Sequence, residues 1–145
     1  MAEYSYNSQQ TVAYSQPVLL NNSIPCPYGR VYHRNESGNL LLRSRNCSCR
    51  RGFTRYQVTF NGNIALPEGG TVGPISVSIS ANGEAIPTSK AIVTPAAVEQ
   101  FFNVTSTAII DIPNGCCFNV AIENVSDNNA SILVENANVV VTSLN

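Results

Sequence analysis

The fold is decided by residues 74–81, which read Pro74-Ile-Ser-Val-Ser-Ile-Ser-Ala81. Successive side chains of a β-strand point to opposite faces, so Ile75, Val77 and Ile79 share one face and three serines share the other. This alternation predicts a half-buried strand whose apolar face points into a protein core.

The same period-two pattern recurs along the chain. Residues 117–123 place Phe118, Val120 and Ile122 on one face, and residues 56–60 alternate in the same way. Further strands are expected at residues 11–20, 29–33, 40–43, 91–93, 104–112, 131–134 and 139–144. Turn residues separate these runs, and Asn82-Gly83 gives the strongest hairpin signal. Eight to ten short strands predict an all-β, antiparallel sandwich or barrel.

Two segments fall outside this pattern. Thr94 and Pro95 could cap and begin a helix through residue 102, but it would be no longer than a turn or two. Residues 1–10 have no apolar periodicity, and we interpret them as an N-terminal arm that orders only against something else. Residues 11–145 then form one domain, which at this length can bury a sufficient hydrophobic core without disulfides or metal ions to stabilise it.

Basic residues are concentrated in residues 30–55. They are Arg30, Arg34, Arg43, Arg45, Arg50, Arg51 and Arg55. With one acid, Glu36, this stretch has a formal charge of +6, whereas the rest has Lys90 against eight acids, or −7. Arg43 and Arg45 would share one strand face, where an acidic surface could bind both. We rank docking to a partner subunit first, a solvated basic loop second and nucleic-acid binding third, because the other acids supply the partner in a homo-oligomer.

Five cysteines allow more than one interpretation. They are Cys26, Cys47, Cys49, Cys116 and Cys117. The spacing of Cys47 and Cys49 is too close for a common zinc knuckle, so no metal site is expected. Disulfides within or between subunits are one hypothesis, and reduced cysteines acting as small core residues are the other. Strand parity places Cys116 inward beside Phe118 and Cys117 outward.

No reaction chemistry is indicated. His33 is the sole histidine, it lies next to Arg34, and no local carboxylate is placed to make it a catalytic base. The acids are scattered among turns and polar faces, and no nucleotide or metalloprotease motif occurs. The protein is therefore expected to be no enzyme and to need no cofactor. The N-terminus shows no secretory signal and no apolar run could span a bilayer, which predicts synthesis in a cytoplasm and no membrane partner.

Three stretches carry a resemblance to a known class. They are Gln10-Thr-Val-Ala-Tyr-Ser-Gln-Pro-Val-Leu-Leu20, Gly38-Asn-Leu-Leu-Leu42 with Arg55-Tyr-Gln-Val-Thr-Phe60, and Asn138-Val-Val-Val-Thr-Ser-Leu144. Over residues 10–145 the chain resembles bacterial and bacteriophage domains of the C1q/TNF-like class. The resemblance implies a ten-stranded jelly roll that assembles as a trimer. Such domains form virion head-fibre or decoration proteins and the tips of collagen-like spore-surface proteins.

The resulting prediction is a structural protein of a bacteriophage virion, a trimeric capsid decoration or head-fibre protein that docks on other capsid or surface-layer subunits. A Gly-X-Y stalk does not occur in the sequence, which disfavours the collagen-like setting. Two alternatives stay open. One is a carbohydrate-binding module, since jelly rolls often bind sugars on Asn- and Tyr-lined surfaces. The other is a cysteine-cross-linked subunit of a spore or cell surface or appendage.

Overall fold

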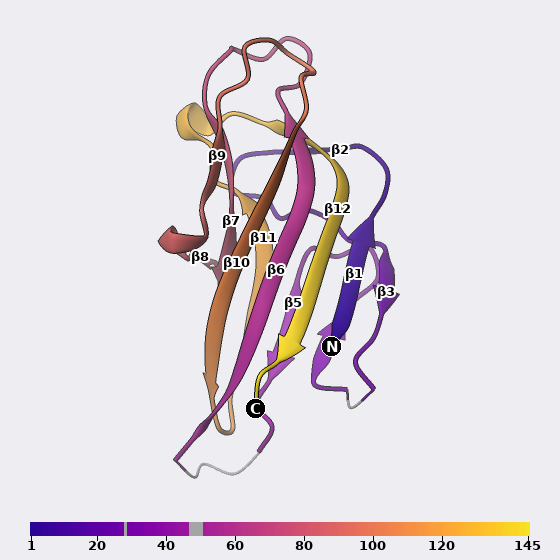
Figure 1. Ribbon diagram of the computed structural model, residues 1–145, viewed down its shortest axis with the longest axis vertical. Helices are drawn as coiled ribbons and strands as arrows, with labels where there is room; N and C mark the ends of the chain where they lie inside the picture. The colour runs from indigo at the N-terminus through magenta and orange to yellow at the C-terminus, as the bar shows by residue number, and fades with distance from the viewer. Residues whose placement is uncertain (28, 47–50) are drawn as a thin grey trace.

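Two antiparallel six-stranded sheets pack face to face in the computed structural model, which describes residues 1–27, 29–46 and 51–145 (Figure 1). The first, called the β6 sheet, contains β1 (Ala2–Tyr6), β2 (Gln10–Val12), β3 (Asn22–Ile24), β6 (Phe53–Ala65), β10 (Phe102–Pro113) and β12 (Ile132–Ser143). The second, called the β11 sheet, contains β4 (Val31–His33), β5 (Leu40–Arg43), β7 (Ile75–Ala81), β8 (Glu84–Ala85), β9 (Ala91–Val93) and β11 (Cys117–Asn124).

The strand order confirms the predicted jelly-roll sandwich. The β6 sheet runs β10-β6-β12-β1-β3, with β2 also paired to β12. The β11 sheet runs β4-β5-β11-β7-β8, with β9 also paired to β7. Two short 3-10 helices, η1 (Pro87–Ser89) and η2 (Asp127–Asn129), lie in loops. Residues 94–101 form bends and a turn before β10 begins at Phe102, so the short helix expected there does not form.

The core lies between the sheets and uses the predicted apolar faces. Val58 and Phe60 on β6 and Val120 on β11 are fully buried, with Val139 of β12 beside Phe60. Burying each such side chain contributes roughly 1.5–3 kcal/mol. The period-two pattern therefore identified the residues that hold the two sheets together.

Strand β7 is buried on both faces, which corrects the expectation of a half-buried strand. Its serines are covered as completely as Ile75, Val77 and Ile79. Ser78 Oγ contacts Ser89 Oγ at 2.9 Å, and Ser126 Oγ accepts a hydrogen bond from the backbone N–H of Ser76. Because hydroxyl groups can be buried once they are hydrogen-bonded, η1 and the segment after β11 cover the serine face.

The N-terminal segment is not an arm, which is a second correction. Ala2–Tyr6 form β1, which pairs with β12 on one side and with β3 on the other. Ala2 and Tyr4 point into the core and are each 1% exposed. Two inward residues and backbone pairing on both sides suffice to order this polar segment within the subunit.

The hairpin predicted at Asn82-Gly83 is confirmed. Strands β7 and β8 pair across it, and both turn residues have positive φ angles, 53° and 80°. By contrast, the two strands expected within residues 131–144 are one strand, β12, with a register shift between Glu135 and Asn138.

Candidate functional site

Three arginines line hollows that Asn145 also lines, at the end of the sandwich where the C-terminus lies, the lower end in Figure 1. Arg45 lines two hollows of about 250 Å³ each; Arg30 lines the first and Arg51 the second. The backbone N–H of Arg43 donates to the carbonyl of Arg30 at 2.9 Å. We call Arg30, Arg43, Arg45 and Arg51 the basic end.

Strand geometry explains how the basic end is presented. Leu42 and Ser44 are buried while Arg43 and Arg45 are exposed. Strand β5 ends at Arg43 and Arg45 lies in the bend that follows, so the shared strand face expected for the two arginines stays a prediction. The backbone at Arg45 is held in place because its N–H donates to Thr54 Oγ1 at 2.6 Å. The fold therefore fixes the backbone and leaves these two guanidinium groups turned outward.

A buried tyrosine lies beneath the basic end. The hydroxyl of Tyr56 donates to the backbone carbonyl of Arg43, and its ring is in the core. Burial raises the pKa of Tyr56, and the positive charge of Arg30 opposes part of that rise. This hydroxyl stays protonated at neutral pH, so the basic end keeps its positive charge without a phenolate beneath it.

Arg55 differs from the basic end because it is paired within the subunit. Its guanidinium donates two hydrogen bonds to Asp111, at 2.7 and 2.8 Å, and lies 4.9 Å from the ring centre of Phe53. The hydrogen bond from Arg55 lowers the pKa of Asp111 below its ordinary value. Arg34 lies in the β4–β5 turn, where its carbonyl accepts from Ser37 N–H. Arg50 lies outside the described residues.

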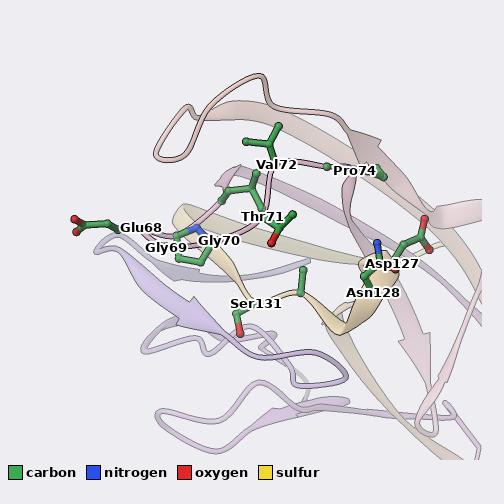
Figure 2. A pocket seen from close by; sticks show the side chains of 13 residues that line it. Glu68, Gly69, Gly70, Thr71, Val72, Pro74, Asp127, Asn128 and Ser131 are labelled. Carbon is green, nitrogen blue, oxygen red and sulfur yellow. The ribbon is translucent and has the colours of Figure 1, made fainter.

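Acidic side chains gather at the opposite end, where the loops at residues 66–74, 94–101 and 125–131 meet. The backbone N–H of Glu99 donates to the carbonyl of Leu66 at 2.8 Å, joining two of these loops. A cavity of about 450 Å³ lies between residues 66–74 and the 127–131 turn. Figure 2 shows Glu68 extending away from this cavity, with Asp127 across it. We call Glu68, Glu99 and Asp127, all exposed, the acidic end.

The outer face of the β6 sheet is largely uncharged. Its central rows consist of Thr105, Asn61, Asn138, Thr107, Thr59 and Val140. We call these six residues the polar sheet face. Thr59 and Thr107 contact each other through their hydroxyls at 3.3 Å, and Asn61 Oδ1 accepts from Thr105 Oγ1. Charged neighbours are Glu3, which accepts a hydrogen bond from Asn138, Glu135 farther along β12 and the Arg55–Asp111 pair.

Sequence reasoning missed both the acidic end and the polar sheet face. A signal for the sheet face exists, because Thr59 and Asn61 alternate with Val58 and Phe60 and so had to point outward. No comparable signal exists for the acidic end. Its three residues come from separate loops that only the strand order brings together.

The cysteine predictions have mixed outcomes. Cys117 is exposed, as strand parity predicted, but Cys116 is also exposed rather than inward. The reason is that β11 begins at Cys117, and Cys116 lies in the preceding turn, where its N–H donates to the carbonyl of Pro113. Cys26 is half-buried against the core, and all three are free thiols. Cys47 and Cys49 lie outside the described residues.

His33 is held by two serines. Its Nδ1 lies 3.0 Å from Ser23 Oγ and its Nε2 lies 2.8 Å from the Ser37 carbonyl. A carbonyl can only accept, so Nε2 donates, and in the neutral ring Nδ1 then accepts from the serine hydroxyl. The ring also lies 5.0 Å from that of Tyr4. His33 therefore connects β3, β4 and the β4–β5 turn.

The described residues contain neither a metal-binding cluster nor a membrane-spanning helix. Across residues 1–27, 29–46 and 51–145, no group of three or more His, Cys, Asp or Glu side chains is placed to hold a metal ion. Over the same ranges, no helix has the length and apolar character needed to cross a membrane.

Comparison with solved structures places the fold among the C1q/TNF-like jelly rolls. The Eiger TNF from S. frugiperda superimposes with a TM-score of 0.66 at 11% identity, covering 100% of this chain and 92% of that one. The globular domain of zebrafish complement 1qA protein gives a TM-score of 0.55 at 14% identity, covering 97% and 96%. No protein-family model and no curated protein matches the sequence. The likeness therefore establishes the fold.

Proposed function

We propose that this protein is a non-enzymatic structural subunit that assembles as a homotrimer through the polar sheet face. We further propose that it belongs to a bacteriophage virion, as a capsid decoration or head-fibre protein. The observation that carries the proposal is the low charge of a broad, exposed sheet face in the middle of the molecule.

Composition distinguishes this face from an ordinary solvated one. Depletion of charge is the main compositional signal of the centre of an interface, where desolvating a charge is costly. Thr and Asn can be buried at low cost when their polar atoms are hydrogen-bonded. Thr59, Thr105 and Asn61 already bond to neighbours on the same face, so a partner would leave few unpaired groups.

The size of the face fits a stable contact. The polar sheet face is the centre of the outer face of the β6 sheet, which spans some nine paired residues of β10, β6 and β12 and the five residues of β1. With strands about 4.8 Å apart and about 3.3 Å per residue, this outer face has a projected area of roughly 500 Å². Specific interfaces bury about 800 Å² of accessible surface per partner, which exceeds projected area because side chains stand out from the sheet. The face is therefore large enough to hold subunits together.

The resemblance of residues 10–145 to C1q/TNF-like domains supports the threefold symmetry and the virion setting. Domains of that class assemble as compact trimers, and their phage members are head-fibre and decoration proteins. The polar sheet face gives this chain a surface through which the same arrangement could form.

A charge placed at the centre of the face tests the assembly. We expect light scattering on a sizing column to give three times the 15.6 kDa chain mass for the wild type in about 1 M salt, where surface charges are screened. Thr59→Lys should give the single-chain mass with an unchanged circular-dichroism spectrum, because a lysine buried there would have only Thr107 and Val140 as its direct cross-strand neighbours and no carboxylate beside it. Asn119→Lys, on the outer face of β11, is the control and should stay trimeric. A wild type of single-chain mass would contradict the proposal.

The virion setting has its own test. Mass spectrometry of density-purified particles from a culture that produces this protein should recover the chain in a fixed ratio to the major capsid protein. Recovery from the cell fraction alone would refute the virion role and leave the trimer untouched.

A further inference from the structure

Charge is segregated along the long axis of the sandwich. Arg43, Arg45 and Arg51 are exposed at the basic end, and Glu68, Glu99 and Asp127 are exposed at the acidic end. After Arg55 the sequence contains one further basic residue, Lys90, beside η1 and away from the acidic loops. Figure 1 shows the loops of the two ends at opposite extremes of the molecule.

The two ends act as separate charged surfaces. Strand β6 has 13 residues and runs between them, which at about 3.3 Å per residue separates the ends by about 40 Å. The Debye length is only about 8 Å at physiological ionic strength. Within one subunit the electrostatic interaction between the two ends is therefore largely screened. Each end presents a surface of its own charge to an approaching molecule.

We propose that copies of this protein stack end to end, with the basic end of one against the acidic end of the next. Three exposed guanidinium groups face three exposed carboxylates in such a contact. Arg55 and Asp111 show the geometry within one subunit, where a guanidinium donates two hydrogen bonds to one carboxylate. Arginine suits this contact because its planar fork matches a carboxylate.

The occupant is a second copy because this chain carries both halves of the contact. A nucleic acid would use the basic end alone and would leave the acidic end without a partner. The contact is heterologous, joining two different surfaces, so it does not close on itself unless a rotation makes it do so. Repeated addition therefore builds a fibre with a direction, basic at one extremity and acidic at the other.

Stacking goes beyond side-by-side assembly through the polar sheet face. That face lies along the flank of the sandwich, on β10, β6 and β12, whereas the two ends are loops and turns. Subunits joined by their flanks would keep both ends accessible. The two contacts use different residues and respond differently to salt, so each can fail without the other.

Salt dependence is the first test. Sedimentation velocity of the wild-type protein should show large species at about 10 mM salt and the flank-to-flank assembly alone at about 1 M, since the Debye length falls from about 30 to about 3 Å. Electron micrographs at low salt should show fibres one assembly wide. An unchanged sedimentation profile across this range would overturn stacking, while the mass at high salt reports separately on the trimer.

Charge reversal at each end is the second test. Combined Arg43→Glu, Arg45→Glu and Arg51→Glu makes both ends acidic, and combined Glu68→Lys, Glu99→Lys and Asp127→Lys makes both ends basic. Each variant alone should remain unstacked at low salt, because like charges repel. An equimolar mixture should recover the large species, since acidic ends again meet basic ends. Folding of each variant is checked by its circular dichroism.

The control reverses charges away from both ends, with Glu84→Lys and Lys90→Glu near η1 and β8, and should stack like the wild type. A mixture no larger than its separate components would overturn the proposal. Tight binding of a labelled DNA duplex by a protein that forms no large species at low salt would also overturn the proposal, because the basic end would then be a nucleic-acid-binding surface.

Discussion

Tyr4 and Tyr56 show what one hydroxyl group contributes in this core. Both side chains are 1% exposed, on β1 and β6 of the same sheet. The hydroxyl of Tyr56 donates to the Arg43 carbonyl, whereas the Tyr4 hydroxyl finds no partner among the described residues. Burial also raises the pKa of Tyr4, so the hydroxyl is neutral and its cost is that of a lost hydrogen bond to water.

The two tyrosines should respond oppositely to loss of that group. Tyr4→Phe should leave the free energy of unfolding unchanged or raise it by about 1 kcal/mol, because an unsatisfied buried hydroxyl is removed. Tyr56→Phe should lower it by about 1 kcal/mol, because the Arg43 carbonyl loses its donor. Urea unfolding with an unchanged slope gives both values. Equal destabilisation by the two changes would show that the Tyr4 hydroxyl does have a partner.

At the scale of elements, the β7–β8 hairpin depends on a backbone conformation, with positive φ, that L-residues rarely adopt. Gly83 has φ = 80°, and a Cβ placed on it would meet no atom within 4 Å. A substitution there is thus penalised by conformation alone, at about 1–2 kcal/mol for the left-handed region.

Replacing this glycine isolates that penalty. Gly83→Ala should lower the free energy of unfolding by about 1 kcal/mol. Gly73→Ala is the matched control, because Gly73 is equally open but has no positive φ in the disfavoured range. It should be neutral or stabilise by up to about 1 kcal/mol by restricting the unfolded chain. Thermal unfolding of both variants measures the difference, and equal effects would refute a backbone origin.

Elements whose residues alternate cleanly could be predicted from the sequence. Ile75, Val77 and Ile79 identified β7, and the alternation over residues 56–60 identified part of β6. Alternation says nothing about what covers a polar face, however, so the buried serines of β7 were predicted to be exposed. It also fails beyond a strand end, which is why Cys116 was placed inward.

Features that depend on topology could not be predicted. β1 contains Glu3, Ser5 and two tyrosines, and it is ordered by β12, a strand more than a hundred residues away. The Arg55–Asp111 pair likewise requires the register of β6 against β10. The acidic end needs three loops at one extremity, which no local pattern encodes.

For the whole molecule, the pairing of the first strand with the last is the decisive long-range contact. β12 lies between β6 and β1, and β1 adds Ala2 and Tyr4 to the core. Removal of β1 would expose one edge of β12 and open the core where Tyr4 lies. Large-to-small changes at buried aromatic positions cost about 3–5 kcal/mol, and deletion should cost at least as much.

Deletion of residues 1–7 tests this contact. The shortened protein should unfold at a clearly lower urea concentration, with a loss of at least about 3 kcal/mol. A synthetic peptide of residues 1–8 added in trans should restore part of the loss, and the same peptide with Tyr4→Ala should not. A shortened protein with the wild-type unfolding midpoint would instead support an N-terminal arm that orders only against something else.

The β1–β12 pairing also has a consequence for synthesis on the ribosome. Residues 2–6 are synthesised about 135 residues before their partners at 137–141. At roughly 5–20 residues per second, β1 waits on the order of ten to thirty seconds as an unpaired strand. Its polar composition, Ala-Glu-Tyr-Ser-Tyr, suits that interval, because a charged and hydroxyl-rich segment has little tendency to pair with neighbouring nascent chains. The same polar residues that give β1 no apolar periodicity therefore keep it from aggregating until β12 has been synthesised.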